Sequence, residues 1–342
     1  MEFRPHRLVC ATLGLVLIGC GGAVGQAAPP DAPVFKVEDL KAAAEQVSHG
    51  FEARIVEVAR SLQNEPNLKN LSEQQRIARV EFVLGNTFFI LLHEMGHVHI
   101  SEMKLPVLGR EENEADTFAA ITMLRVVTEF SERVLTDASQ GWFLNSRRDT
   151  QTGAVPAYYD EHDLSPQRAY QVVCLMVGSD PVKFKHLADD AKMPGSRQQS
   201  CKHDYEKALR GWNTVLAPYR RAADQPETKI NVVYGDAQGM FAPFARGFRE
   251  MHILETVAAR TAALYTWPAP FTLQMLSCDG PNASWDDEKR TLTICYQLAF
   301  DFAQLYQAYV QAPPPAAPVV AAKQKRGRKS GSAVGARAAS GH

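Results

Sequence analysis

The pattern His-Glu-x-x-His at residues 93–97 constrains this chain more than any other feature. It lies inside an apolar run over residues 88–98. Residues four apart lie one above the other on a helix, so His93 and His97 can direct two imidazoles at one metal ion. Glu94 lies beside that face, where its carboxylate can reach a water molecule activated by zinc. The sequence therefore predicts a buried helix with a zinc-binding face and Glu94 as general base.

An acidic cluster downstream of the second histidine predicts a third ligand. Glu112 and Asp116 are one helical turn apart. A glutamate here completes a set of two histidines and one carboxylate, which leaves the fourth position on zinc for water. Asp116 can accept a hydrogen bond from the non-ligating nitrogen of a ligand histidine and so fix its tautomer. Glu111 and Glu114 are alternative ligands, but only Glu112 is followed by an aspartate four residues later.

Together the two motifs resemble those of the gluzincin metallopeptidases, of which thermolysin is the best known. The fuller string, HEMGH followed by LPVLGREENEAD, is more similar to a bacterial family of metallopeptidase-like proteins of unknown function. The resemblance implies a zincin-like α+β fold that is mostly helical, with a central HExxH helix and a small sheet. It also implies Zn²⁺ as cofactor and a peptide or protein as substrate.

A later histidine is a candidate for a second catalytic role. His162 follows Asp160 in the string YYDEHD. In thermolysin-like enzymes a downstream histidine, oriented by an aspartate, stabilises the oxyanion of the tetrahedral intermediate. The resemblance assigns this role to His162 and Asp160. The alternative is a polar cluster that only caps and solvates the start of the next helix.

The N-terminus has the pattern of an export signal. Two arginines precede an apolar run over residues 8–18, which is too short for a permanent bilayer span. Cleavage after Ala27 predicts a signal peptide over residues 1–27. Alternatively, the string LIGC is a lipobox that ends at Cys20, which then carries lipid. Either way the mature chain is predicted outside the cytoplasm: periplasmic, lipid-anchored to the cell envelope, or secreted.

The mature chain is predicted to form one metallopeptidase domain over residues 28–311, followed by a Pro/Ala-rich tail over residues 312–342. The tail holds six basic residues and no acidic residue. This composition cannot bury a core and predicts disorder. Because the whole chain has a formal net charge of −1, the rest of it is acidic. The tail either aids solubility or binds anionic envelope polymers or lipid head groups; nucleic acid is not an expected partner.

Four cysteines downstream of the export signal are even in number, and the predicted compartment is oxidising. The predicted disulfides are Cys174–Cys201 and Cys278–Cys295, since each pair flanks one local unit. A zinc site made of all four cysteines is the weaker alternative, because no C-x-x-C spacing occurs.

Two alternating segments, residues 271–275 and 291–295, predict a β-hairpin closed by the second disulfide. Between them, Asn282-Ala283-Ser284-Trp285 is similar to the edge strand that binds substrate backbone in thermolysin-like enzymes. Asn282 and Ala283 are therefore predicted to hold an extended peptide by strand addition. Ser284 replaces an aromatic residue, and the segment follows the zinc helix instead of preceding it. An accidental match is the alternative.

Apolar spacing predicts the remaining elements. Helices are expected over residues 35–66, 72–100, 111–135, 166–176, 202–216 and 241–265, a short strand over 230–234, and a loop over 138–160. The helix that carries the zinc motif is predicted to be the buried centre of the fold, not a membrane span, because polar residues interrupt its apolar run.

The predicted function is that of a zinc metallopeptidase, a hydrolase of peptide bonds. The alternative is a non-catalytic, zinc-stabilised binding or scaffold lipoprotein of the cell envelope. The intact Glu94 favours the enzyme. So does the lack of a fourth protein ligand in the sequence pattern, since structural zinc sites are closed by four ligands.

Overall fold

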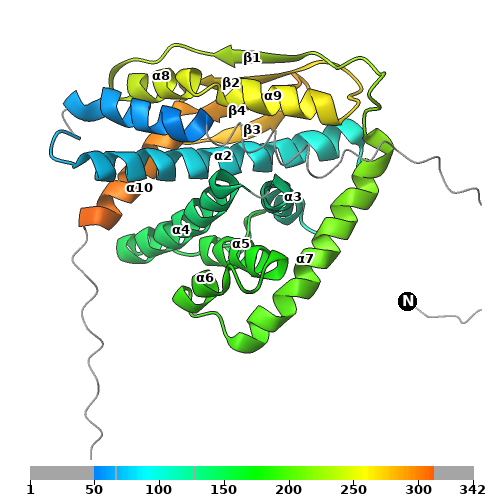
Figure 1. Cartoon of the computed structure of the whole chain (residues 1–342), viewed down its shortest axis with the longest axis horizontal. Coiled ribbons are helices and arrows are strands. Elements are labelled where there is room, and N and C mark those ends of the chain that lie inside the picture. The colour runs from blue at the N-terminus through cyan, green and yellow to red at the C-terminus, as the bar shows by residue number, and fades with distance from the viewer. Residues whose placement is uncertain (1–49, 66–67, 127, 312–342) are drawn as a thin grey trace, which may run out of the picture.

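The structure is a computed structural model that describes residues 50–65, 68–126 and 128–311. The predicted signal peptide, Cys20 and the basic tail lie outside these residues. Within the described part, the fold is mostly helical with one small four-stranded sheet. The sheet lies on one side of helix α2, and helices α3 to α6 lie on the other (Figure 1).

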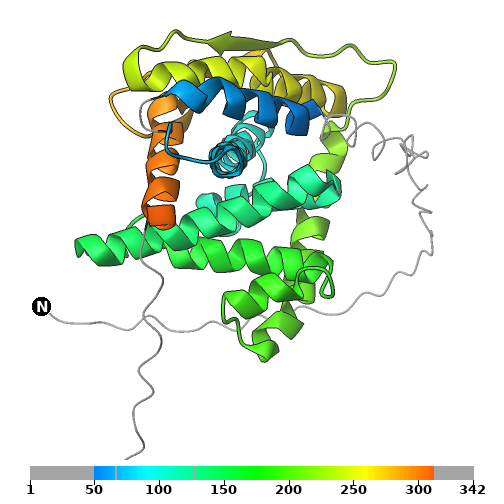
Figure 2. The ribbon, with the colours of Figure 1, turned by 60° about the vertical axis from the view of Figure 1, so that its left-hand side comes forward.

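Helix α2 (Glu73–Met103) is the centre of the molecule. A reciprocal pair of hydrogen bonds between Ser72 and Gln75 caps its first turn. Between residues 82 and 100 nearly every side chain is buried. Figure 2 shows α2 almost end-on, with other helices around it. The predicted buried central helix over residues 72–100 is thus confirmed, with three further residues at its C-terminal end.

The single helix predicted over residues 111–135 is wrong, because two helices occupy this region. Helix α3 (Glu111–Val126) is followed by α4 (Glu129–Thr152). Thr128 starts the second helix, since its side chain accepts a hydrogen bond from the Ser131 amide and the Ser131 hydroxyl accepts one from the Thr128 amide.

The loop predicted over residues 138–160 is also wrong up to residue 152, because α4 continues to Thr152. Gly141, one of four residues in this segment that are typical of loops, lies within this helix. A Cβ atom at Gly141 would stand 1.9 Å from the Asn86 Oδ1 atom, so the glycine allows α4 to cross α2 closely. The helix ends at Gly153, whose φ of 70° supplies a left-handed cap.

Helices α5 (Ser165–Ser179), α6 (Lys185–Asp190) and α7 (Gly195–Leu216) complete the helical side. The two helices predicted here are confirmed, although α7 begins earlier than expected and α6 was not predicted. A disulfide between Cys174 and Cys201 joins α5 to α7, as predicted from the cysteine spacing.

The sheet contains β1 (Ile230–Tyr234), β2 (Phe271–Leu276), β3 (Ala283–Asp286) and β4 (Thr291–Cys295), in the order β1-β2-β4-β3. The predicted hairpin of β2 with β4 is wrong, because these strands pair in parallel. The reason is that β3 lies between them in sequence and reverses the chain, so β4 returns in the direction of β2. The antiparallel pair is β3 with β4. The predicted disulfide Cys278–Cys295 is confirmed.

The predicted helix over residues 241–265 is divided by His252, whose φ is 52°. The resulting helices are α8 (Ala242–Glu250) and α9 (Ile253–Leu264), and α10 (Tyr296–Gln311) follows the sheet. Short 3₁₀ turns occupy Leu62–Asn64, Ala217–Tyr219 and Gly239–Phe241.

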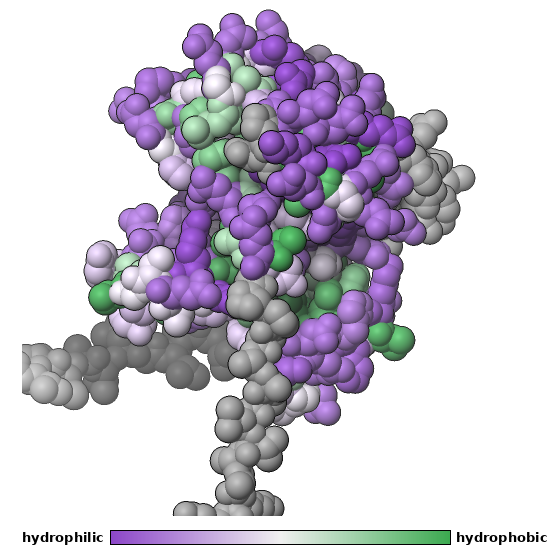
Figure 3. Space-filling model, turned by 90° about the vertical axis from the view of Figure 1, so that its left-hand side faces the viewer, coloured by the Kyte–Doolittle hydropathy of each residue, from purple (hydrophilic) through white to green (hydrophobic). Residues whose placement is uncertain are grey.

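Among the helices in the described residues, none has both the length and the apolar character that a bilayer crossing requires. One side of the surface is mostly hydrophilic, with hydrophobic residues only in small separate patches (Figure 3). The apolar stretch of α2 is therefore covered by the protein's own elements, and its predicted place in the core is confirmed.

Candidate metal centre

Two helices build the candidate site, and a glycine allows them to approach. His93, Glu94 and His97 lie on α2, where the first two are buried. Gly96, in the same motif, faces α3: a Cβ atom added there would stand 2.9 Å from the Ala115 Cα atom. This close packing brings the first turns of α3 against the histidine face of α2.

Three donor atoms converge at this contact. The Nε2 atoms of His93 and His97 are 3.2 Å apart. The Glu112 Oε2 atom lies 3.1 Å from the first and 3.4 Å from the second. A tetrahedral zinc ion with ligand bonds of about 2.0–2.1 Å has ligand atoms about 3.3 Å from one another. The spacing of the three atoms therefore fits a zinc ion.

The Glu112 Oε2 atom provides a second test of this fit. It is buried, and no described donor meets the geometry of a hydrogen bond to it, although imidazole nitrogens of three histidines lie within 3.4 Å. A buried carboxylate oxygen without a partner is costly. Two imidazoles and a carboxylate that share one focus form a suitable donor set for a metal ion, which would replace the protons on the imidazoles and satisfy this oxygen.

His162 lies at the same place, although it comes from the loop between α4 and α5. Its Nε2 atom is 2.9 Å from Glu112 Oε2, and its ring stacks on His93 with 6.1 Å between centroids. Ligand atoms of His93, Glu112 and His162 all lie within 4.8 Å of one another. His162 is thus within reach of the metal focus and was predicted only for oxyanion stabilisation.

The His162 loop is held by polar contacts at both of its sides. Asp160 Oδ1 accepts hydrogen bonds from the backbone amide and from Nδ1 of His162, at 2.9 and 3.1 Å. Asp163 forms a 2.9 Å ion pair with Arg110, just before α3. The predicted partnership of Asp160 with His162 is therefore present in the structure.

Asp116 contacts the first histidine, as expected for an orienting residue. His93 Nδ1 donates a 2.8 Å hydrogen bond to Asp116 Oδ1, which leaves Nε2 as the atom that faces the metal focus. His97 has an equivalent partner in Glu111, whose Oε1 atom accepts a 2.9 Å hydrogen bond from Nδ1. Glu111, considered as an alternative ligand, thus contacts the non-ligating nitrogen. Glu114 lines a separate groove.

Sequence reasoning missed Arg168. This residue of α5 is buried and donates to both oxygens of Asp116, through Nε at 2.7 Å and Nη2 at 2.6 Å. The available signal was its position, since Arg168 shares a helix face with the buried residues Val172 and Leu175. A cation at a core position needs a buried anion, which is Asp116.

The ionisation of the site follows from burial and from the mixture of charges. Burial raises the pKa of Glu94, and neighbouring imidazoles only partly oppose this. Burial would raise the pKa of Glu112 too, but its three histidine neighbours hold it well below the usual range. Burial lowers the pKa of His97, yet Glu112 and Glu111 overcome this and raise it to about 9. Burial would raise the pKa of Asp116, but Arg168 and His93 together outweigh it and lower the pKa to about 2. The carboxylates of the site thus stabilise positive charge beside them, whether on the imidazoles or on a bound cation.

Strand β3 places the predicted substrate segment at the edge of the sheet, packed against α2. The Cys295 amide donates to the Asn282 carbonyl, so the Asn282 carbonyl is occupied by β4. Peptide groups alternate in direction along an antiparallel strand, so those of Ala283 and Trp285 face the free edge. Of the two predicted contact residues, Ala283 offers its backbone to a peptide and Asn282 does not.

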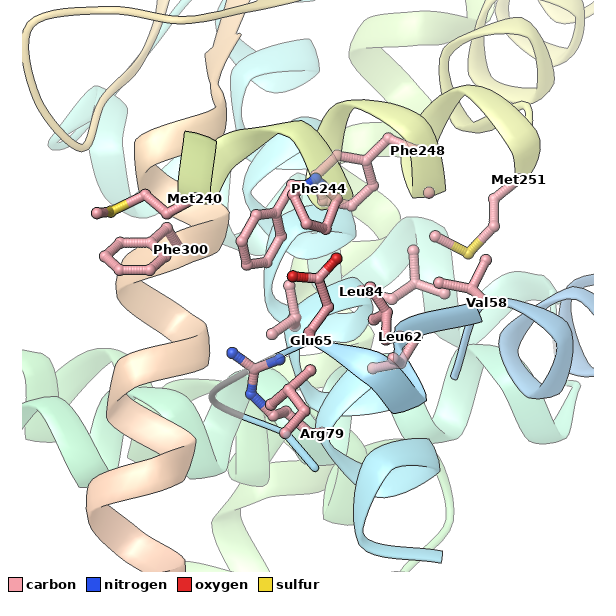
Figure 4. Close-up of a pocket in the computed structure, with 15 residues that line it drawn as sticks. Val58, Leu62, Glu65, Arg79, Leu84, Met240, Phe244, Phe248, Met251 and Phe300 are labelled. Atoms are coloured by element: carbon pink, nitrogen blue, oxygen red, sulfur yellow. The ribbon is translucent and has the colours of Figure 1, made fainter. Parts of the chain in front are cut away.

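In the described part of the chain, two hollows are lined partly by residues of α2 but by no residue of this cluster. A groove of about 890 Å³ runs between α3, α5 and α7, beside the α2–α3 connection. A smaller apolar pocket of about 100 Å³ lies between the N-terminal helix (described over residues 50–61), α2, α8 and α10 (Figure 4). Glu65 and Arg79 are its charged lining residues, and no histidine lines it. Among the described residues, the group of side chains placed to hold a metal ion is the one at the α2–α3 contact with His162 beside it.

His99 lies two residues past the motif, a helical spacing that turns its side chain away from the face of His93 and His97. It is packed: it is buried among Phe118, Tyr265 and Trp267, and its Nδ1 atom donates to the Met95 carbonyl at 2.6 Å. Burial lowers its pKa to about 4, so its ring is neutral at neutral pH.

Comparison with known proteins gives one family match. Residues 54–216 match the model of a family described as "Putative metallopeptidase". The matched residues include every member of the cluster from His93 to Arg168 and none of the sheet. No curated protein and no solved structure matches the chain. The match supports a metallopeptidase-like family of unknown function, and it agrees with a metal site in the described residues.

Proposed function

We propose that this chain is a zinc metallopeptidase with a zincin-like site, in which His93, His97 and Glu112 bind Zn²⁺. The observation that carries the proposal is the convergence of their three donor atoms at 3.1–3.4 Å, next to the buried Glu94. The family match, which covers the whole cluster, supports peptide hydrolysis as the reaction class.

Zinc, when bound, polarises a carbonyl group and makes a water molecule more acidic. Glu94 takes a proton from the attacking water and passes it to the leaving amine. Its raised pKa suits both tasks, because a general base works best with a pKa close to the operating pH.

His162 and Asp160 act on the charge that develops on the substrate oxygen. The Nε2 atom of His162 faces the cluster, and Asp160 holds the other ring nitrogen. A fixed donor aimed at a developing oxyanion lowers the barrier to acyl transfer. The free edge of β3, with the peptide groups of Ala283 and Trp285, binds the substrate in an extended conformation.

A second candidate function is a zinc-stabilised, non-catalytic binding or scaffold protein. The observation that favours it is the position of His162, because a fourth protein ligand would close the site to water. The half-exposed ring of His162 and its hydrogen bond to Asp160 favour the enzyme, since the loop leaves the ring accessible to a substrate.

The substitution Glu94→Gln tests the proposal. We expect about one zinc per chain in both the wild type and the variant, with hydrolysis of fluorescently labelled casein reduced roughly 10²- to 10⁴-fold in the variant. Glu114→Gln, which removes a nearby carboxylate outside the cluster, is the matched control and keeps both properties. Undiminished cleavage by Glu94→Gln would contradict the role of Glu94 as general base. Zinc binding without any cleavage by the wild type would favour the scaffold.

Export and attachment complete the proposal. We propose that residues 1–27 direct the chain out of the cytoplasm, that lipid on Cys20 or the basic tail attaches it to the envelope, and that peptides there are its substrates. Metabolic labelling with a radioactive fatty acid, comparing the full chain with Cys20→Ala, distinguishes lipidation from simple cleavage after Ala27.

A further inference from the structure

We propose that Arg168 is a positioning residue of the metal centre, which fixes the ring of His93 through Asp116. The inference rests on the proposed zinc site and deepens it. It concerns a residue that contacts no proposed ligand carboxylate and lies outside the motifs that predicted the site.

The hydrogen bonds leave Asp116 no freedom to turn. Arg168 donates from Nε to Oδ2 at 2.7 Å and from Nη2 to Oδ1 at 2.6 Å, so both carboxylate oxygens are held in the plane of the guanidinium. The same Oδ1 atom accepts the 2.8 Å hydrogen bond from His93 Nδ1. Arg168 Nη2 also lies 3.5 Å from His93 Nδ1, so the guanidinium plane sets the direction of the His93 ring both directly and through Asp116.

The burial of the Arg168–Asp116 ion pair indicates a role beyond stabilising the fold. The side chains of Arg168 and Asp116 are only 7% and 3% exposed. Removing two charges from water costs free energy that their attraction often fails to recover, and apolar replacements of equal volume are frequently as stable. The geometric control of His93 supplies a reason for the charged pair to be there.

The indole ring of Trp142 packs on the face of the Arg168 guanidinium, whose edge is held by Asp116. The Arg168 Cζ atom lies 3.8 Å from the centre of the Trp142 ring, a stacking contact that arginine makes and lysine does not. Trp142, Arg168, Asp116 and His93 come from α4, α5, α3 and α2 in turn. Four helices thus determine where one imidazole points.

Because Arg168 lies near the start of α5, its ion pair with Asp116 also holds that end of the helix against α3. Arg168 lies in the first turn of α5, and His162 immediately precedes that helix. The Arg168–Asp116 pair and the Arg110–Asp163 ion pair both tie this segment to α3, on either side of Glu112. The contact that fixes His93 therefore also holds the start of α5 beside the cluster.

Two substitutions test the role. Arg168→Met removes the charge and both hydrogen bonds, whereas Arg168→Lys keeps the charge but loses the planar fork. We expect the zinc Kd, measured by competition with a chromophoric chelator, to rise roughly 10- to 100-fold for methionine, as for other partners of ligand histidines. Lysine should give an intermediate rise of about threefold to tenfold. The visible absorption bands of the Co²⁺-loaded protein should change in both variants.

Arg148→Met is the matched control. Arg148 also forms a bidentate pair, with Asp301, at 2.8 and 3.0 Å, but this pair joins α4 to α10. Its loss should lower the melting temperature and leave the zinc Kd and the Co²⁺ spectrum unchanged. A change common to all three variants would show a general loss of structure and would overturn the inference.

The remaining outcomes separate the inference from the proposed function. Zinc binding by the wild type, with a Kd within about twofold in Arg168→Lys and in any folded Arg168→Met, would overturn the role of Arg168 alone. Should Arg168→Met not fold, the lysine variant decides. A wild type that binds no zinc after remetallation would overturn the proposed function and, with it, this inference.

Discussion

Gly96 on α2 lies so close to Ala115 on α3 that a Cβ atom at Gly96 would stand 2.9 Å from the Ala115 Cα atom. The neighbour is backbone, which cannot turn aside as a flexible side chain can. The segment between His93 and His97 is thus also where α2 packs against α3. The distance between α2 and α3 determines whether Glu112 reaches the histidines.

Gly96→Ala should therefore weaken metal binding by moving α3 outward. We expect the zinc Kd to rise at least about tenfold and the protein to lose roughly 1–3 kcal/mol of stability, as for other overpacked contacts. Gly211→Ala on α7 is the control, because nothing lies within 4 Å of its added Cβ atom. That variant should bind zinc normally. Equal zinc affinity in both variants would contradict the argument.

The third ligand can be identified by comparing three acidic residues of α3. Glu112→Ala should abolish or sharply weaken zinc binding, because only this carboxylate lies within 3.4 Å of both histidine Nε2 atoms. Glu111→Ala should weaken zinc binding moderately, since it removes the partner of His97 Nδ1. Glu114→Ala should leave it unchanged. Zinc content by atomic emission, measured on all three, would refute the assignment if Glu112→Ala retained a full equivalent.

His162→Ala distinguishes an oxyanion donor from a fourth ligand. For the donor, zinc affinity should stay within about threefold of the wild type while kcat falls roughly 10²- to 10³-fold. For a ligand, zinc affinity itself should fall and the Co²⁺ spectrum should change. Asp160→Asn, which alters only the orienting hydrogen bond, should give a smaller change of the same kind.

The edge of β3 predicts a backbone effect on substrate binding. Ala283→Pro removes an amide that faces the free edge and leaves the ladder with β4 intact, since edge positions of this kind tolerate proline. We expect kcat/KM for extended peptides to fall about threefold to tenfold, the effect of one lost hydrogen bond. Ala283→Val keeps the amide and should retain wild-type activity. Zinc binding should be equal in both.

Asp137 makes stability depend on pH. Burial and the neighbouring Glu81 raise its pKa to about 7, against 3.8 for an ordinary aspartate, and its Oδ2 atom has no hydrogen-bond partner. The folded state then holds a proton that the unfolded state has released. The contribution of Asp137 to stability is therefore fully present below about pH 4 and is lost as the pH rises through 7, by a few kcal/mol at most.

Asp137→Asn should remove this loss. Its melting temperature relative to the wild type should rise between pH 5 and pH 8. Asp149→Asn, on the same helix, controls for the loss of one carboxylate. A constant difference between Asp137→Asn and the wild type across this pH range would contradict the assignment.

The sequence predicts those residues of the site that lie close together along the chain. The periodicity of α2 and the spacing of Glu112 and Asp116 both depend on the 3.6-residue helical repeat, which sequence shows directly. Arg168 depends on the docking of α5 against α3, across 52 residues. No local pattern records such a contact, although a cation on an apolar helix face indicates that a buried partner exists.

The errors in the fold have the same origin. Gly141 was interpreted as a loop residue, but it accommodates Asn86 across a helix crossing. The parallel pairing of β2 with β4 depends on β3, a four-residue strand too short to show a clear alternation. Local propensity placed most helices correctly, and the positions of the cysteines around local units gave the disulfide pairs. Tertiary contacts decided strand direction and where long helices divide.

The chain of contacts from Trp142 through Arg168 and Asp116 to His93 exists only in the folded protein. These residues lie on four separate helices between residues 93 and 168. The HExxH segment alone therefore does not fix the direction of the His93 ring. A newly made or partly unfolded chain carries the motif without the centre. A complete set of metal-facing side chains therefore requires the helical half to have docked.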